Sequence, residues 1–167
     1  EYENAKKYIE LSKSVDPENV FIHFDEGLIL MAEGHMKEAQ AKFEKAVEVT
    51  NDAAIFNFFL GWSYYHDNQF EEAIRVLGRK YDIGELPLAL NVAYLSNAYH
   101  KLGNKNESEK YRLELETRLA SGEHHINMSL AMIEAGRNHK NETLTYLEKA
   151  LLDRESAVAY MTNNDPI

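Results

Sequence analysis

The sequence predicts an all-α solenoid, in which antiparallel helix pairs stack along the chain. The first observation is a repeat of about 34 residues, because Gly27 recurs as Gly61 and Ala39 recurs as Ala73. A period of this length is typical of helical-repeat arrays, whose units bury their apolar faces against their neighbours. The second observation is that small residues recur at two positions of each unit, where two helices can approach closely. They are Gly27, Gly61, Ser96 and Ser129 in the first helices, and Ala5, Ala39, Ala73, Ser108 and Thr143 in the second helices.

In the first half of the chain, turn-forming residues divide the predicted helices clearly. A helix expected at 3–14 ends at Asp16-Pro17, because proline cannot continue a helix. The next pair is expected at 20–33 and 36–50, and Gly34 turns the chain between its two helices. In the pair expected at 53–67 and 70–81, Asn68 stands 34 residues after Gly34 and takes the same role.

The second half continues the pattern with small changes in spacing. The pair expected at 87–102 and 105–120 turns at Gly103, and the pair expected at 122–135 and 140–152 turns at Gly136. Gly136 lies only 33 residues after Gly103, whereas Thr143 lies 35 residues after Ser108. The last turn is therefore expected to be about two residues longer than the others, and a short helix is expected at 155–161.

The repeated positions resemble the signature of the tetratricopeptide repeat (TPR), which reads W-x2-L-G-x2-Y, then A-x3-F, then P. The clearest match is Asn57-x2-Leu60-Gly61-x2-Tyr64, followed by Ala73-x3-Leu77. The resemblance implies a right-handed superhelical α-solenoid whose first helices line a concave face. It divides the chain into a half repeat at 1–19, repeats at about 20–53, 54–88, 89–121 and 122–153, and a C-terminal cap at 154–167. Because 1–19 matches only the second helix of a repeat, we expect the chain to be a fragment of a longer protein.

The resemblance also predicts a partner-binding groove, since it places many aromatic side chains on the concave face. Trp and Tyr combine a large contact area with a polar tip, which is why binding surfaces favour them. The alternative is that some of the aromatic residues, Phe21 and Phe59 above all, belong to the core between repeats. The candidate groove residues are Phe24, Leu28, Phe58, Trp62, Tyr65, Tyr94 and Asn97.

The chemistry of these positions narrows the choice of partner. TPR domains that hold a C-terminal carboxylate use Lys, Asn and Arg side chains on their first helices. The matching positions here are Phe24, Leu28, Phe59, Trp62, Leu90 and Tyr94, and none of these carries a cation. A buried carboxylate without a partner is costly, so the groove should prefer a protein or peptide with an apolar helix or extended apolar segment.

Composition argues against several other functions. With 28 acidic and 18 basic residues the net charge is -10, which repels nucleic acid and anionic membrane surfaces. The chain has no cysteine, and its seven histidines lack the spacing of a metal site. A glycine-rich phosphate loop is also missing from the sequence. We therefore expect no metal, no cofactor and no enzyme activity.

Residues 121–166 carry a further resemblance, on Leu130-Ala131-Met132-Ile133-Glu134-Ala135-Gly136 and Leu144-Thr145-Tyr146-Leu147-Glu148-Lys149-Ala150. The segment is similar to the closing repeat of TPR arrays in bacterial signalling proteins, although Tyr146 stands where that pattern usually has Trp. In those families the array commonly follows a winged-helix DNA-binding domain or a nucleotide cyclase domain. The resemblance implies a regulatory, partner-sensing module of a cytoplasmic signalling or transcription-regulating protein.

Three functions stay open at this point. The first is a protein-binding module that uses the aromatic groove. The second is a structural spacer or dimerisation arm, a homodimer included, whose groove is filled by its own chain. The third is a small-molecule sensor with its pocket at Trp62 and Tyr94.

Overall fold

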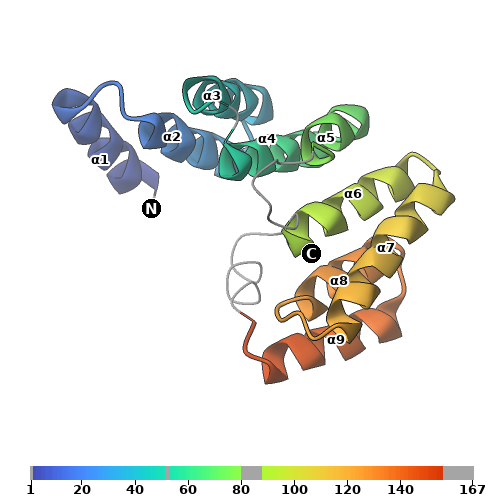
Figure 1. The fold of residues 1–167 in the computed structure, drawn as a ribbon. Coiled ribbons are helices and arrows are strands. Elements are labelled where there is room, and N and C mark those ends of the chain that lie inside the picture. The colour runs from blue at the N-terminus through green and yellow to red at the C-terminus, as the bar shows by residue number, and fades with distance from the viewer. Residues whose placement is uncertain (1, 52, 80–87, 156–167) are drawn as a thin grey trace. The chain divides into compact units, whose positions relative to one another are not determined.

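The computed structural model describes residues 2–51, 53–79 and 88–155, and in that part of the chain all regular secondary structure is α-helical (Figure 1). The all-α prediction is therefore confirmed. The helices are α1 (Tyr2–Val15), α2 (Val20–Ala32), α3 (Met36–Val49), α4 (Ala54–His66), α5 (Phe70–Leu77), α6 (Ala89–Lys101), α7 (Lys105–Ala120), α8 (Asn127–Gly136) and α9 (Lys140–Leu152).

The helices belong to two compact units, Glu1–Val76 and Leu77–Ile167. In the first unit α2 packs on both α1 and α3, and α3 also packs on α4. In the second unit α6 pairs with α7 and α8 pairs with α9, while α8 also packs on α6 and α7. Within each unit these helices thus pack on helices that are near to them along the chain, as in a repeat array. The limits of the individual repeats remain a prediction.

The turn inside each helix pair has one repeated geometry. It is three residues long, and its middle residue adopts a left-handed conformation, with φ of 82° at Gly34, 59° at Asn68, 76° at Gly103 and 63° at Asn138. The residue after it donates its main-chain N–H back to the preceding helix, as His35 does to Leu30 at 2.8 Å and His139 to Glu134 at 2.9 Å. This bond pattern satisfies carbonyl groups that the helix end leaves free.

The turn between α8 and α9 corrects one sequence prediction. Its left-handed residue is Asn138, which lies 35 residues after Gly103, and the turn is as short as the other three. The prediction of a longer turn at Gly136 was wrong, because asparagine tolerates the left-handed region and can replace glycine there. Gly136 is instead the last residue of α8, where a Cβ atom would lie 2.5 Å from Oδ1 of Asn97.

Two predicted helix limits also differ clearly from the structure. Helix α8 begins at Asn127 rather than at 122, because His125 has a φ of 63° and interrupts the helix there. Helix α5 ends at Leu77, and residues 80–81 of the predicted helix 70–81 lie outside the described residues. The short helix predicted at 155–161 also lies outside them, apart from Glu155, which is not helical.

Several of the small residues of the repeat lie at close helix contacts, as predicted for them. In the first unit a Cβ atom on Gly27 would lie 2.6 Å from Cε1 of Phe43, so α2 and α3 can approach only because residue 27 is glycine. In the second unit the Ser96 hydroxyl donates to the carbonyl oxygen of Ser108 at 2.8 Å, which joins α6 to α7. The core of that unit is formed by Val92, Ala93, Leu115, Ile126, Leu130 and Ile133.

Candidate functional site

The predicted groove residues divide between the two compact units. Phe24 and Leu28 lie on α2, and Phe58, Trp62 and Tyr65 lie on α4, all in the first unit. Tyr94 and Asn97 lie on α6 in the second unit. Each group is therefore described within its own unit.

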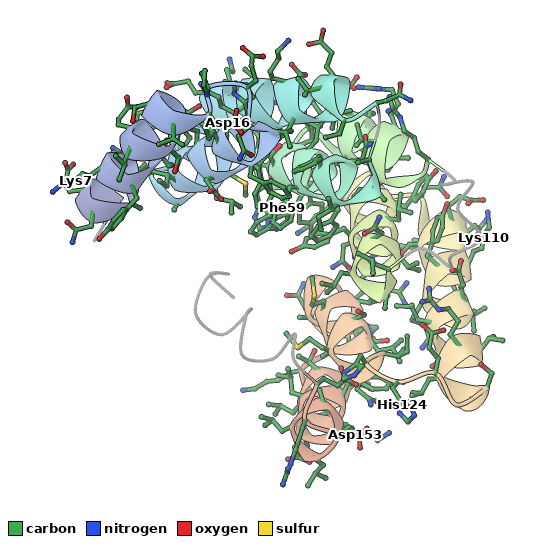
Figure 2. The ribbon with its side chains drawn as sticks, turned by 60° about the vertical axis from the view of Figure 1, so that its left-hand side comes forward. Lys7, Asp16, Phe59, Lys110, His124 and Asp153 are labelled. Carbon is green, nitrogen blue, oxygen red and sulfur yellow. The ribbon has the colours of Figure 1, made fainter. Side chains whose placement is uncertain are left out.

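Helices α2 and α4 carry a cluster of aromatic rings, in which Phe24 is central. Its ring centroid lies 4.7 Å from that of Phe59 and 5.6 Å from that of Phe56, both in edge-on geometry. Such edge-to-face pairs are a favourable arrangement of aromatic rings. Phe43 of α3 supports the cluster from the second helix of the pair, and Figure 2 marks Phe59 within it.

One end of this aromatic cluster is open to solvent. Phe21 contacts the ring of Phe56 at 5.9 Å, yet 59% of Phe21 is exposed, and Ile55 is 47% exposed. Phe59 is buried, as expected for a core residue, but the same prediction was wrong for Phe21. Phe21 lies in the first turn of α2. The exposure of its ring depends on which side chains of other helices cover it, and the sequence around Phe21 does not show this.

Phe58 and Trp62 lie deeper, with 7% and 8% of their surfaces exposed. Their rings are nearly parallel, with 6.4 Å between centroids, and Trp62 also contacts Phe59 edge-on at 5.6 Å. Within the described residues the indole N–H of Trp62 is buried and finds no hydrogen-bond acceptor. Tyr65 is half-buried, and its ring packs against Phe70 at the start of α5.

In the second unit, Tyr94 and Asn97 are both buried. The side-chain amide of Asn97 donates to the carbonyl oxygen of Met132 at 3.0 Å and thereby joins α6 to α8. Its Oδ1 atom is buried without a donor among the described residues. The role of these two residues in binding a partner remains a prediction.

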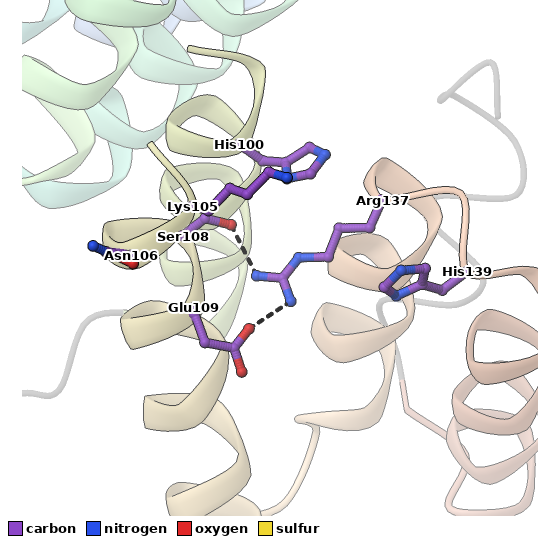
Figure 3. Close-up of a pocket in the computed structure, with 7 residues that line it drawn as sticks. All are labelled: His100, Lys105, Asn106, Ser108, Glu109, Arg137 and His139. Carbon is purple, nitrogen blue, oxygen red and sulfur yellow. Dashed lines mark hydrogen bonds and ion pairs between the residues drawn. The ribbon is translucent and has the colours of Figure 1, made fainter. Parts of the chain in front are cut away.

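A polar cavity, which the sequence analysis did not predict, lies between α6, α7 and the α8–α9 turn. Its volume is about 430 Å³, and Figure 3 shows the residues that line it: His100, Lys105, Asn106, Ser108, Glu109, Arg137 and His139. Arg137 reaches across the cavity from the turn to α7. It donates from Nη1 to Oε2 of Glu109 and from Nη2 to the hydroxyl of Ser108, both at 2.8 Å.

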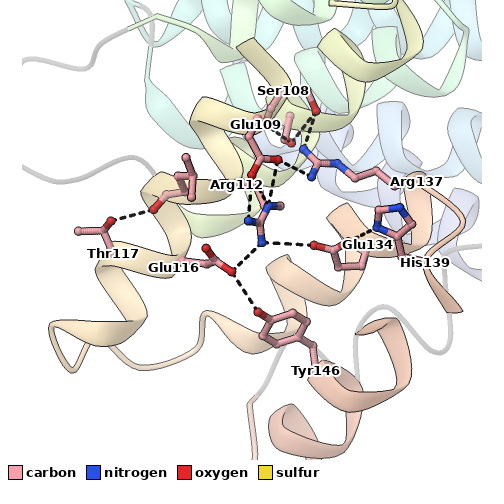
Figure 4. Close-up of polar contacts among 11 residues, drawn as sticks. Ser108, Glu109, Arg112, Glu116, Thr117, Glu134, Arg137, His139 and Tyr146 are labelled. Atoms are coloured by element: carbon pink, nitrogen blue, oxygen red, sulfur yellow. Dashed lines mark hydrogen bonds and ion pairs between the residues drawn. The ribbon is translucent and has the colours of Figure 1, made fainter. Parts of the chain in front are cut away.

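A network of ion pairs continues from this cavity along α7 (Figure 4). Arg112 donates to both carboxylate oxygens of Glu109 and, at 2.6 Å, to Glu116. The buried Glu134 of α8 lies 3.6 Å from Arg112 and contacts Nδ1 of His139 at 2.7 Å. Hydrogen bonds from Arg112, and next from Arg137, lower the pKa of Glu109. The network therefore holds α7 and α8 together through charged groups.

The described residues show neither a metal-binding cluster nor a membrane span. Among them, no three His, Asp or Glu side chains are grouped so that they could hold a metal ion. In the same part of the chain, no helix has the length and apolar character that crossing a membrane requires.

Comparison with known proteins identifies the fold. No protein-family model matches the chain, and no curated protein matches its sequence. Among solved structures, the crystal structure of MamA is similar with a TM-score of 0.61 and 20% sequence identity, over 95% of this chain and 92% of that one. MamA is a TPR-like helical protein, so the similarity confirms a TPR-like array here. At this level of sequence identity the similarity shows the fold.

Proposed function

We propose that this chain is a protein-interaction module whose apolar surface on α2 and α4 binds an apolar segment of a partner protein. The observation that carries the proposal is the exposure of Phe21 and Ile55 beside the aromatic cluster of Phe24, Phe56 and Phe59. Exposed apolar groups that adjoin a ring cluster are typical of protein-binding surfaces.

The charge of these two helices favours an apolar partner over an acidic or a basic one. Helix α4 contains no Asp, Glu, Lys or Arg, and α2 contains only Asp25 and Glu26. The carboxylate of Glu26 is already paired with Lys13 and Lys42. Binding should therefore depend on buried apolar area and change little with salt, because ion pairs contribute little to it.

Each predicted groove residue has a place in this proposal. Phe24, Leu28 and Tyr65, which are half-buried, would supply contact area, and Phe58 would support Trp62 beneath the surface. The buried indole N–H of Trp62 has no acceptor among the described residues, and a shift of the side chains above it would let it donate to a backbone carbonyl of the partner. Tyr94 and Asn97 on α6 are buried in the other unit and would contact a partner only after the residues that cover them move aside.

A second candidate is a spacer or dimerisation arm whose own chain fills the groove. The low exposure of Phe58, Trp62 and Tyr94 favours this reading, because residues of an empty groove would be open to solvent. Light scattering over a range of protein concentrations separates the two candidates. A constant monomer mass favours the binding module, and a mass that doubles with concentration favours the dimerisation arm.

The binding experiment uses peptides selected from a random display library on the purified chain. For a selected peptide, Phe21→Ala and Trp62→Ala should each weaken binding by about tenfold or more while helicity stays unchanged. Leu144→Ala is the matched control, since it removes an exposed leucine from α9 in the other unit. Peptide affinity that responds equally to Leu144→Ala, or to none of the three changes, would exclude α2 and α4 as the binding surface.

Trp62 also provides a direct signal, because it is the only tryptophan in the chain. Because Trp62 is only 8% exposed, its emission in the free chain should already lie towards the blue, and a partner segment that covers α4 should change its intensity and protect it further from a soluble quencher. Emission and quenching that the selected peptide leaves unchanged would instead assign Trp62 to the core.

The proposal extends to the protein that contains this module. The resemblance of residues 121–166 to the closing repeat of bacterial arrays supports a regulatory part of a cytoplasmic signalling or transcription-regulating protein. The net charge of -10 supports a protein partner over nucleic acid or an anionic membrane. The sequence of the full gene tests this, since a neighbouring domain without a signalling or DNA-binding role would contradict it.

A further inference from the structure

The cavity between α6, α7 and the α8–α9 turn differs in charge from the chain as a whole. The net charge of the chain is -10, yet the cavity is lined by Lys105, Arg137 and two histidines against the single carboxylate of Glu109. That carboxylate is shared by two guanidinium groups, those of Arg112 and Arg137. Among the side chains that line the cavity, basic groups therefore outnumber acidic ones, and Glu134 of α8 contacts His139 from outside the lining.

Arg137 is held as a preformed donor in this cavity. Only 9% of its side chain is exposed, and its two Nη atoms are fixed by Glu109 and Ser108 (Figure 3). Among the described residues its Nε–H is buried and has no acceptor. A buried guanidinium group with a free donor is costly unless an acceptor arrives, and arginine binds phosphate with paired donors.

Two further features of the cavity also suit an anion. The ammonium group of Lys105 is exposed and has no ion-pair partner among the described residues. Lys105, Asn106 and Ser108 lie at the start of the 16-residue helix α7, where the helix dipole attracts negative charge. The main-chain N–H groups of Lys105, Glu107 and Ser108 are already bonded within this turn, so the dipole and the side chains make the attraction.

His100 responds to this positive charge. Burial, and next the charges of Arg137, Lys101, Lys105 and His139, lower the pKa of His100. The lowered pKa favours the neutral imidazole, and an anion beside the ring would oppose the part of this shift that comes from the nearby positive charges. His139 contacts Glu134 through Nδ1, which leaves its Nε2 atom available on the same ring.

From this geometry we propose that the cavity binds a phosphoryl group, either inorganic phosphate or the phosphate of a small phosphomonoester. Arg137 and Lys105 supply the charge, the dipole at the start of α7 adds to it, and the two histidines border the site. The volume of about 430 Å³ falls in the usual range for small-molecule pockets and exceeds what a phosphate alone requires. This site is independent of the apolar surface on α2 and α4.

The test is a titration of the whole chain followed by NMR, with inorganic phosphate and glycerol 3-phosphate as probes and sodium chloride holding the ionic strength constant. We expect saturable shifts of the His100 and His139 ring signals and of the amides of residues 105–109. Bound phosphate should also raise the pKa of His100, because the anion favours the charged imidazolium. Tighter binding of glycerol 3-phosphate would identify a phosphomonoester as the ligand, and tighter binding of inorganic phosphate would identify the free ion.

Matched variants separate this site from general electrostatics. Lys105→Gln should weaken phosphate binding by about tenfold, since it removes one charge-assisted contact. Lys101→Gln is the control, because Lys101 is exposed and near the cavity but does not line it. The phosphate affinity of this variant should stay within about twofold of the parent's. Glu109→Gln should strengthen binding, because it removes the carboxylate that competes for Arg137.

Three results would overturn the proposal. The first is a set of shifts that rise linearly without saturation and are reproduced by sodium chloride. The second is an equal loss of affinity in Lys101→Gln and Lys105→Gln. The third is an unchanged His100 pKa at saturating phosphate. Because Lys105 is exposed, Lys105→Gln should fold normally. It therefore tests the site without any change to the buried Arg137.

Discussion

Glu155 caps the N-terminus of α8 at Asn127, which lies 28 residues earlier in the chain. Its Oε1 atom accepts the main-chain N–H of Asn127 and its Oε2 atom accepts that of Met128, both at 2.9 Å. Ile126, the residue before the helix, supplies no side-chain cap, and Glu155 is only 3% exposed. A distant carboxylate thus takes the place that a Ser or Asp immediately before the helix usually holds.

Replacing Glu155 should therefore loosen the start of α8. We expect Glu155→Ala to lower the free energy of unfolding by about 1–2 kcal/mol, as loss of a helix cap does. Hydrogen exchange at the amides of Asn127 and Met128 should become faster. Glu148→Ala removes an exposed acid from α9 and should cost less than about 0.5 kcal/mol. Equal losses of stability in the two variants would contradict the capping of α8 by Glu155.

A second prediction concerns the contact between Gly27 and Phe43. Gly27→Leu should lower the free energy of unfolding by about 1–3 kcal/mol or more, because its first side-chain atom already overlaps the Phe43 ring. Ala41→Leu adds similar bulk on an exposed position of α3 and serves as the control in urea unfolding. If both variants unfolded at the parent's urea concentration, α2 and α3 would not approach closely at Gly27.

The hydroxyl of Tyr64 donates to Oε1 of Glu44 at 2.6 Å, and this bond should shape the alkaline stability of the first unit. Burial, and next the bond to Glu44, raise the pKa of Tyr64 from 10.0 to about 12. The neutral phenol therefore stabilises the fold fully below pH 10, and this stabilisation is lost as the pH rises from 10 towards about 12.

We expect Tyr64→Phe to lower the free energy of unfolding at pH 8 by about 1.5 kcal/mol, since it removes a hydrogen bond to a charged group. The difference from the parent should shrink between pH 10 and about 12. Tyr8→Phe changes an exposed tyrosine and is the control for urea unfolding at each pH. A difference that stays constant across this range would contradict a role for the Tyr64 proton.

Glu26 should control stability at acid pH. Its carboxylate lies 2.6 Å from Lys13 and 2.7 Å from Lys42, so it joins α2 to both α1 and α3. Burial alone would raise the pKa of Glu26, but the two lysines outweigh it and lower the pKa from 4.5. Its contribution to stability is thus present above pH 4.5 and is lost as the pH falls through the lowered value.

Glu26→Gln should therefore cost about 1 kcal/mol at neutral pH, and the difference from the parent should vanish in strong acid. Glu48→Gln removes the acid of an exposed pair with Lys45 and should cost less than about 0.5 kcal/mol. Urea unfolding at a series of pH values measures both. A larger loss of stability for Glu48→Gln than for Glu26→Gln would contradict the role of Glu26 in joining α2 to α1 and α3.

The candidate sites could be predicted from the sequence only in part. The repeat was sufficient to assign aromatic residues to the first helices, because this assignment depends only on the position of each residue within its repeat. It did not show that Phe21 is exposed while Phe58 and Trp62 are buried. It also missed the cavity at Arg137, because arginine near a turn is common and only its contacts with Ser108 and Glu109 distinguish this one.

The sequence by itself determined the all-helical class, the helix pairs and the close contacts at Gly27, Ala39, Ser96 and Ser108. These features depend on neighbouring helices and recur at a fixed period, so the order of residues is enough to specify them. The tertiary structure decided the turn at Asn138, the late start of α8, its cap by Glu155 and the position of Arg137. The cap and the Arg137 contacts join residues 27–29 positions apart, and the helix start depends on left-handed His125, so none of these leaves a periodic pattern in the sequence. Asn138 does keep the period, 35 residues after Gly103, but the glycine at Gly136 drew the sequence prediction to the wrong residue.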